Sequence, residues 1–285
     1  MLDSGSFAYA ASGAVLNNTL DSGGVDLVAG MASGTTVSNG GTELVLGGGS
    51  TVSAAIFSGG VESVEGTASA TTVSNGGYEF VAAGGSADGT IIDSGGFVYV
   101  ASGGSISGVT ISDGTLDLTS GAVVTSGALA VTFSSGGELI LNDAVHFGGL
   151  VAGFSGTDSM DLVNIPYVTS GGSGSQTTVS WMQPTSSANA SGTLTVSEGG
   201  STANITLLGQ YVAGNFSIQR CIAANRRLSV FVRRLEPLLS SSNEPEPRSI
   251  TSWRIHEFLP VVRRELPLCP IDCLGPSVDQ SVQAG

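Results

Sequence analysis

The sequence contains no lysine, and all nine of its arginines lie at or beyond position 220. Residues 1–219 therefore carry 16 of the 23 carboxylate side chains and no basic side chain other than His146. A region of this kind cannot neutralise phosphate groups, which argues strongly against nucleic acid or an anionic membrane surface as a partner.

Cysteine is also missing from residues 1–219, since Cys221, Cys269 and Cys273 all follow them. This absence argues against a disulfide-stapled secreted domain. No apolar run reaches 18 residues, so no transmembrane helix is predicted. The start "MLDSGSFAYA" has neither the basic nor the apolar segment of a signal peptide. We therefore expect a fragment of a larger protein or a misplaced start.

Glycine is abundant instead, with 43 residues, and it recurs in pairs. The pairs lie at 23–24, 40–41, 59–60, 76–77 and 95–96. Their spacing alternates between 17 and 19 residues, and the hexapeptide "TVSNGG" at 36–41 returns unchanged at 72–77. A period near 18 residues indicates a solenoid. Val, Ile, Thr, Phe and Tyr between the glycine turns favour strands over a leucine-rich repeat. We predict an all-β, parallel β-helix with two or three short strands per turn.

Apolar residues recur at two phases of this repeat, as the interior of a coil requires. The first column lies four positions after each of the five glycine pairs and comprises Val28, Val45, Val64, Val81 and Val100; in the worn copies we assign Thr119 and Ile140 to it. The second column precedes the glycines and comprises Leu20, Val37, Phe57, Val73, Ile92 and Ile111. Stacked in register, the columns predict one continuous core that no single turn could bury alone.

Acidic residues occupy a third phase, two positions before the valine column. They are Asp26, Glu43, Glu62, Glu79, Asp117 and Glu138. Strict alternation would point them into the core, where unpaired carboxylates are costly. We therefore expect a corner or bulge that turns them outward as a solvated stripe, in preference to a calcium-bridged one. Alternatively, acids and valines share an edge, and the inward column is Leu27, Leu44, Phe80 and Tyr99.

The repeats resemble the passenger repeats of AIDA-type autotransporter adhesins, also described as strand-loop-strand repeats. Three segments carry the resemblance: "TVSNGGTELVLGGGSTVSA" (36–54), "TVSNGGYEFVAAGGSADGT" (72–90) and "IIDSGGFVYVASGGSISGV" (91–109). The resemblance covers about residues 2–141. It implies a right-handed β-helix, export to the cell surface, and an adhesive or scaffolding role. It also implies heptosylation of repeat hydroxyls by a dedicated transferase, for which Thr36, Ser38, Thr72 and Ser74 would be the acceptors by position.

Composition divides the chain into three regions. Residues 1–142 hold the repeats, and residues 143–219 are expected to form further strands that cap or close the solenoid. Residues 220–285 hold all the arginine and cysteine and seven of the nine prolines, but only two glycines. We predict that these last residues form an irregular tail, either disordered or translated out of frame.

No recognisable catalytic, cofactor or metal site accompanies the repeats. A lyase acting on acidic sugars needs Arg or Lys, and the carboxylates that a hydrolase would use recur with the repeat and form no unique pair. His146 has no identifiable partner, and Cys269 and Cys273 lack a histidine at zinc-site spacing. Asp158 and Asp161 lie in a single, isolated copy of a calcium-type nonapeptide. We predict no enzyme activity, no cofactor and no metal.

We predict a non-enzymatic segment of a secreted or surface-exposed bacterial repeat protein. It would bind a host or sister cell, matrix or glycan through many weak contacts along the coil. Tyr78, Phe97 and Tyr99 are either part of an adhesive patch or a stack inside the coil. The alternatives are a polysaccharide-processing β-helix enzyme and a non-functional fragment of a larger autotransporter-like protein. No pattern identifies the ligand, the secretion route or the oligomeric state.

Overall fold

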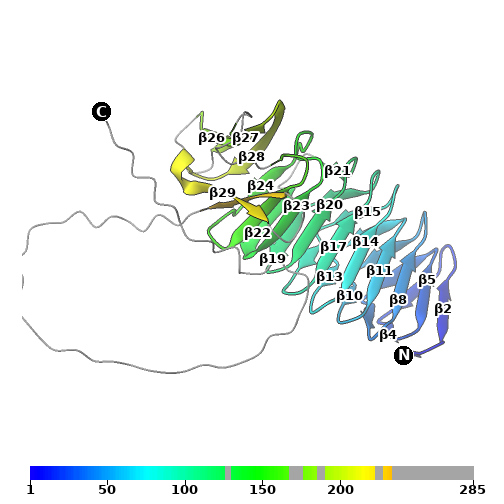
Figure 1. Ribbon diagram of the computed structural model, residues 1–285. Helices are drawn as coiled ribbons and strands as arrows, with labels where there is room; N and C mark the ends of the chain where they lie inside the picture. The colour runs from blue at the N-terminus through cyan, green and yellow to red at the C-terminus, as the bar shows by residue number, and fades with distance from the viewer. Residues whose placement is uncertain (126–129, 167–175, 185–189, 222–226, 233–285) are drawn as a thin grey trace, which may run out of the picture. The chain divides into compact units, whose positions relative to one another are not determined.

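The computed structural model describes residues 1–125, 130–166, 176–184, 190–221 and 227–232. These residues form β-strands and one short 3-10 helix, Ala213–Asn215. The strands build three sheets whose members lie one above another along a coil (Figure 1). The predicted all-β solenoid is confirmed.

Each sheet takes one strand from successive turns. In sheet A the order is β1 (Leu2–Asp3), β4 (Leu20–Ser22), β7 (Thr36–Ser38), β10 (Ala55–Ile56), β13 (Thr72–Val73), β16 (Ile91–Ile92), β19 (Val109–Ser112), β22 (Val131–Ser135), β24 (Leu150–Ala152), β28 (Ser201–Leu208), β27 (Ser191–Glu198) and β26 (Thr178–Met182). In sheet B the order is β2 (Phe7–Ala10), β5 (Val25–Val28), β8 (Thr42–Val45), β11 (Val61–Val64), β14 (Tyr78–Val81), β17 (Phe97–Val100), β20 (Thr115–Leu118), β23 (Gly137–Leu141), β25 (Asp158–Leu162), β30 (Arg227–Val232) and β29 (Phe216–Cys221). Sheet C runs β21 (Val123–Val124), β18 (Ser105–Ser107), β15 (Ser86–Asp88), β12 (Thr67–Ser69), β9 (Ser50–Val52), β6 (Met31–Ser33) and β3 (Val15–Asn17).

The chain visits sheets A, B and C in that order in each of the first seven turns, from β1–β2–β3 to β19–β20–β21. Neighbouring strands within these turns are parallel, so residues one period apart face each other. Two further turns, β22–β23 and β24–β25, continue sheets A and B.

The glycine pairs form the corners between sheets A and B, and their two members serve different purposes. Gly76 adopts a φ of +86°, a left-handed conformation that glycine reaches without strain. Gly77 lies so close to the turn below that a Cβ there would stand 2.4 Å from the Ile56 carbonyl oxygen. The corners also stack, because the N–H groups of Asn75 and Gly76 donate to the carbonyls of Ser94 and Gly95 in the next turn. The repeated hexapeptide is therefore a corner that recurs along the coil.

The valine column forms the interior face of sheet B. Val28, Val45, Val64, Val81 and Val100 are fully buried and paired in register. The last two predicted members are wrong, because the column continues through Leu118 and Leu141 and not through Thr119 and Ile140. Thr119 and Ile140 lie five and three positions after Gly114 and Gly137, whereas the residues four positions after these glycines are Leu118 and Leu141.

The second predicted column lies on the interior face of sheet A, with two corrections. Ile56, not Phe57, pairs with Val37 and Val73, and Phe57 is 37% exposed. Asp21, not Leu20, occupies the position next to Val37. Its carboxylate is buried there because it accepts the N–H groups of Gly24 (2.7 Å) and Thr42 (2.9 Å).

Five strands complete the described coil beyond β25; β28 pairs parallel with β24, and the other new pairs are antiparallel. Strands β28, β27 and β26 extend sheet A, and β30 and β29 extend sheet B (Figure 1). Their inward residues, among them Leu194, Ile205 and Val230, join the same core. The boundary expected between residues 219 and 220 falls inside β29. Residues 233–285, with Cys269 and Cys273, lie outside the described residues.

Candidate functional site

Four acidic side chains stack inside the coil, and we call them the interior carboxyl ladder: Asp26, Glu43, Glu62 and Glu79. They occupy the same position of β5, β8, β11 and β14, and each pairs in register with the next. All four are fully buried. They therefore share the inward face with the valine column, as strict alternation along a strand requires.

The expected corner or bulge does not exist, and the outward stripe was a wrong prediction. The rival inward column was wrong too, because Leu27, Leu44, Phe80 and Tyr99 lie on the outer, partly exposed face. Two predicted acids do not belong to the ladder. Asp117 and Glu138 pair with the outward positions Tyr99 and Thr115. The ladder position itself continues through Val98, Leu116, Leu139 and Met160, all buried.

Small side chains leave room for the ladder. The inward residues of sheet C beside it are Ala32, Thr51, Ala68 and Ala87, all fully buried. The Thr51 hydroxyl donates to Glu43 Oε1 at 3.4 Å. Three further buried threonines, Thr35, Thr71 and Thr90, precede strands of sheet A. Their hydroxyls make no hydrogen bond at ordinary distance, but they lie close enough to Glu43, Glu62 and Glu79 to act on the pKa of these carboxyls.

Burial raises the pKa of every ladder carboxyl. For Asp26, burial and the negative charge of Asp21 outweigh the N-terminal ammonium and bring the pKa to about 6. Burial raises the pKa of Glu43 and Glu79 to about 7 although the hydroxyls of Thr35 and Thr90 act to lower it. The pKa of Glu62 lies well above its ordinary value, because it is buried and flanked by Glu79 and Glu43. The ladder therefore favours its uncharged form.

The outer face of sheet B carries aromatic side chains that stack from turn to turn. Tyr78 and Phe97 lie with ring centroids 5.6 Å apart and ring planes at 7°. Phe80 and Tyr99 repeat this arrangement at 5.7 Å and 15°. The rings are therefore outside the coil, where each covers one face of its neighbour. Because stacked rings expose mainly their edges, they form a flat strip and not a set of separate binding platforms.

The outer face of sheet A presents hydroxyl groups. Thr36 and Thr72 are partly exposed and occupy one register row, separated by Ala55 of the intervening turn. Ser38 is also partly exposed, whereas Ser74 is only 6% exposed. Three of the four predicted acceptor hydroxyls are thus on the accessible side of the coil.

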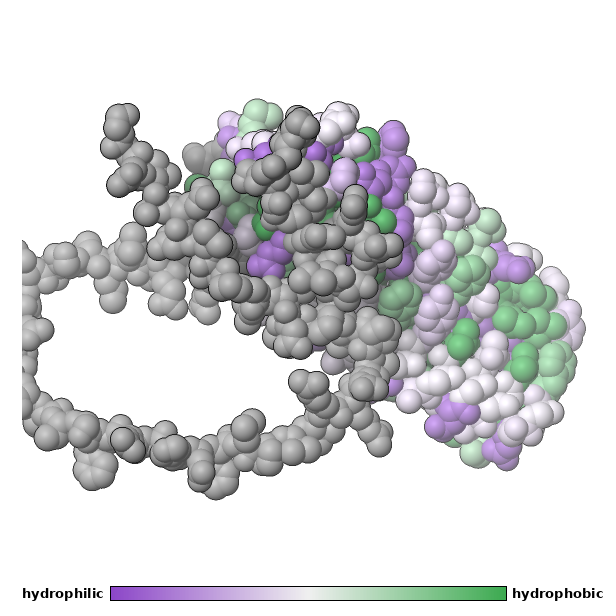
Figure 2. All heavy atoms as spheres, in the orientation of Figure 1, coloured by the Kyte–Doolittle hydropathy of each residue, from purple (hydrophilic) through white to green (hydrophobic). Residues whose placement is uncertain are grey.

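Apolar side chains gather at the first turns of the coil. Phe7, Tyr9 and Leu20 are 61%, 53% and 41% exposed. Figure 2 shows hydrophobic residues on the visible face over the N-terminal turns. Among the described residues, no helix has the length and apolarity needed to cross a bilayer.

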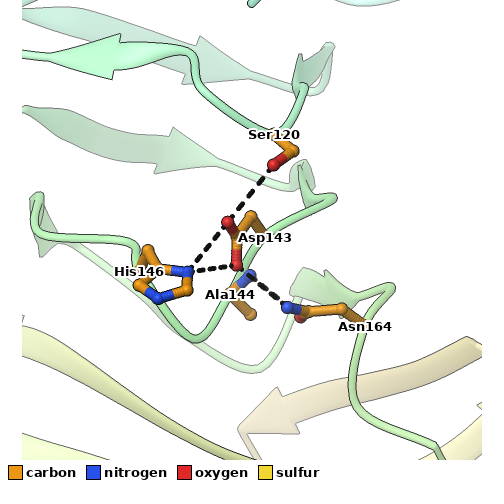
Figure 3. Close-up of polar contacts among 5 residues, drawn as sticks. All are labelled: Ser120, Asp143, Ala144, His146 and Asn164. Atoms are coloured by element: carbon orange, nitrogen blue, oxygen red, sulfur yellow. Dashed lines mark hydrogen bonds and ion pairs between the residues drawn. The ribbon is translucent and has the colours of Figure 1, made fainter.

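His146 does have a partner, contrary to the sequence interpretation. Its Nδ1 lies 2.9 Å from both carboxylate oxygens of Asp143 (Figure 3). Asn164 and Ser120 donate to the same carboxylate at 3.0 and 3.3 Å, and Asn164 also accepts the Ala144 N–H. Burial acts to raise the pKa of Asp143, but the hydrogen bonds and charge of His146 lower it overall.

This cluster has the residue types of a serine hydrolase triad but not its order. A triad needs the histidine between the serine and the acid, so that it can take the serine proton. Here Asp143 is in the middle, and Ser120 bonds to the acid. The cluster therefore holds successive turns of the solenoid together by hydrogen bonds. We call Ser120, Asp143, His146 and Asn164 the clasp.

We expect the clasp to depend on Asn164 more than on His146. His146 is 80% exposed in its side chain, so His146→Ala should change the free energy of unfolding by less than about 1 kcal/mol. Asn164→Ala removes two hydrogen bonds between turns and should cost about 1–3 kcal/mol. Urea titrations of both variants at pH 7 measure the difference, and an equal loss would contradict this account.

Asp158 and Asp161 do not form the calcium site that their spacing suggests. Three positions apart on β25, they point to opposite faces of the strand. Asp158 accepts the Ser155 N–H, and Asp161 accepts the Ser229 hydroxyl. Within the described ranges, no group of three or more His, Cys, Asp or Glu side chains lies close enough to hold a metal ion.

Comparison with known proteins finds similarity in the repeat region of the chain. A family model described as "Adhesin of bacterial autotransporter system, probable stalk" (AIDA) matches residues 64–115. Among solved structures, the chain is similar to a crystal structure of a TibA fragment hyper-glycosylated by TibC, with 30% sequence identity and a TM-score of 0.38. That alignment covers 53% of this chain and 61% of the TibA fragment, less than two thirds of its length. No curated protein matches the chain. For residues 64–115, the family match confirms the resemblance to AIDA-type autotransporter-adhesin stalk repeats that was stated from the sequence.

Proposed function

We propose that this chain is a non-enzymatic, adhesive scaffold segment of a surface-exposed or secreted bacterial protein. The observation that carries the proposal is the repetition of the outer faces: the same strand positions face outward, in register, in each of the first seven turns. An adhesin stalk family and an extended coil agree with this role.

Repetition favours binding through many weak contacts over binding in one pocket. A partner that engages one turn finds the next equivalent position about 4.8 Å away. Each further contact is then intramolecular, so affinity grows with the number of turns engaged. Host or sister cells, matrix and their glycans present repeated groups of the kind that such a surface would bind.

Sugar attachment to the repeat hydroxyls belongs to the same proposal. Thr36, Ser38 and Thr72 are accessible acceptors on the outer face of sheet A, whereas burial makes Ser74 the poorest of the four. Attached sugars would extend the outer face without disturbing the core, because these side chains point away from it.

Deleting two turns in phase tests the multivalent mechanism. Removal of residues 37–72 joins Thr36 to Val73 and restores an intact "TVSNGG" corner, so the shorter coil should still fold. Retention of the protein on host or sister cells should fall by roughly tenfold or more, because avidity falls steeply as contacts are lost. Cell retention is measured by flow cytometry with labelled protein, and circular dichroism verifies the fold of the shortened chain.

Two outcomes would contradict the proposal. Unchanged retention of the shortened chain would place binding outside the repeats, and loss of all binding in a single surface variant such as Tyr78→Ala would indicate one pocket. Turnover of soluble polysaccharides by the purified chain, followed as new reducing ends or unsaturated uronates, would instead establish the enzymatic alternative.

A further inference from the structure

The interior carboxyl ladder lies in a coil whose side chains offer it no positive charge. Residues 1–219 contain neither lysine nor arginine. The neighbouring charges that affect Asp26 and Glu43 are Asp21, which is itself negative, and for Asp26 the N-terminal ammonium. Four ionised carboxylates, stacked about 4.8 Å apart in a sheet, would repel one another and would each be buried without compensation. Ionisation of the ladder therefore opposes folding of the turns that contain it.

Apart from Asp21, the side chains packed around the ladder are not ionisable. Sheet A contributes Val37, Ile56, Val73 and Ile92, sheet C contributes Ala32, Thr51, Ala68 and Ala87, and the ladder's own strands contribute the valine column. Apart from Asp21, the polar groups that face the ladder are the threonine hydroxyls described above. Nothing in these surroundings accepts or supplies a charge.

The hydrogen-bonding atoms of the ladder are mostly unpartnered. Both oxygens of Asp26, Glu62 and Glu79 accept no hydrogen bond at ordinary distance, and the hydroxyls of Thr71 and Thr90 form none there either. These two hydroxyls lie near Glu62 and Glu79. A carboxylate can only accept hydrogen bonds, so neighbouring carboxylates cannot bond to one another. A protonated carboxyl supplies one O–H donor, which can reach the carboxyl of the next turn or a threonine hydroxyl. Protons therefore remove the charge and also provide the missing donors.

A metal ion fits the ladder less well than protons do. The carboxyls are in single file, one per turn, and the described residues bring no three acidic, histidine or cysteine side chains together around a common point. Calcium takes six to eight oxygen ligands, more than two carboxyls and the nearby threonines supply between successive turns.

We propose that the ladder is a proton-dependent lock: the turns from β5 to β14 close only while their interior carboxyls are protonated, and they open as the pH rises. The turns from β17 onward, where Val98, Leu116, Leu139 and Met160 take the ladder position, stay closed over the same range. The turns from β17 to β23 thus lack the pH dependence of the ladder, whereas in β25 burial also raises the pKa of Asp158.

The direction of the pH dependence follows from the proton balance. In the unfolded chain these carboxyls titrate at their ordinary pKa values, near 4, whereas in the folded coil the pKa is about 6 for Asp26 and about 7 for Glu43 and Glu79. Between those values the folded state holds protons that the unfolded state has lost, so stability falls as pH rises. The stabilisation is complete below about pH 4 and is lost as pH passes through the folded pKa values. Because neighbours interact, the ladder titrates as a unit.

Substitution of Glu62 tests the lock against a matched control. Glu62→Gln keeps the size of the side chain and removes one titrating group from the middle of the ladder. Glu65→Gln makes the same chemical change three residues later, on an exposed side chain. From urea midpoints between pH 5 and 8.5, the wild type should lose stability as pH rises. Glu62→Gln should release about one proton fewer on unfolding, and Glu65→Gln should behave like the wild type.

Hydrogen exchange locates the effect. After correction for the intrinsic pH dependence of exchange, amides of β5–β14 should exchange faster at pH 8.5 than at pH 5, and amides of β17–β23 should not. Infrared spectra of the wild type at pH 6 should show a protonated carboxyl band, although exposed carboxyls are ionised there. This last measurement needs no variant and holds even if Glu62→Gln fails to fold.

Three results would overturn the proposal. These are an equal pH dependence of Glu62→Gln and Glu65→Gln, a missing protonated carboxyl band at pH 6, and a midpoint at pH 8.5 that rises when calcium or magnesium is added to chelator-treated protein. The last result would assign the neutralising role to a cation.

Discussion

Replacing Ile92 with alanine is expected to lower the free energy of unfolding by about 2–5 kcal/mol. Ile92 is fully buried on the interior face of sheet A, where it pairs in register with Val73 below and Ile111 above. Truncation leaves a cavity between two turns that the stacked backbone cannot close, because each turn is held at a fixed spacing by its hydrogen bonds. Urea unfolding followed by circular dichroism measures the loss.

The residue next to it provides the control. Ile91 is 41% exposed on the outer face of the same strand, β16. Ile91→Ala should change stability by less than about 1 kcal/mol, since little apolar surface returns to water. If both variants lost the same stability, strand β16 would not have the inward and outward faces described here.

The glycine period predicted the fold because each corner needs one residue with positive φ and one residue without a Cβ. The corner fixes the phase of the neighbouring strands, and Val37, Val73 and Ile92 were assigned correctly by counting from it. Phe57 was assigned wrongly because it was chosen as a large apolar residue and not by its distance from the glycine pair. Ile56 lies three residues before that pair, as Val37, Val73 and Ile92 do before theirs. In an amphipathic strand two residues long, one position decides which side chain is inside.

The ladder was misplaced for a different physical reason. We expected a bulge because we took the carboxylates to be ionised, and burying ionised carboxylates without partners costs a large free energy. A protonated carboxyl is a neutral, polar side chain of moderate cost, and alanines across the coil provide its space. Ala32, Thr51, Ala68 and Ala87 recur with the period, and the sequence shows this recurrence of small residues. It does not show that these residues lie across the coil from the acids, because that depends on how each turn folds in space.

The clasp around Asp143 could not be read from the sequence. Its members Ser120, His146 and Asn164 are 23, 3 and 21 residues away, and only the winding of the coil brings the first and last of them together. Because the repeat has worn away in this part of the chain, no periodic signal marks these positions. Local exceptions to a repeat are therefore found by structure, while the repeat itself is found by counting.

Substitution of Gly77 with alanine is expected to cost about 1–3 kcal/mol, although the change adds a single methyl group. An ideal Cβ at this position would lie 2.4 Å from the carbonyl oxygen and 2.7 Å from the carbonyl carbon of Ile56, both of them backbone atoms. Neither atom can move without breaking the hydrogen bonds between turns, so the corner between β13 and β14 must separate from the turn below. Thermal unfolding should show a lower midpoint, and hydrogen exchange should rise first in β10–β14.

Gly47→Ala is the matched control for this prediction. A Cβ at Gly47 would meet no atom within 4 Å, and the backbone there is not in the left-handed region. This variant should be neutral or more stable by up to about 1 kcal/mol, because alanine restricts the unfolded chain. A loss of stability at Gly47 equal to that at Gly77 would mean that glycine acts through chain flexibility alone. The contrast between the two variants thus separates close packing of successive turns from the general flexibility of a glycine-rich chain.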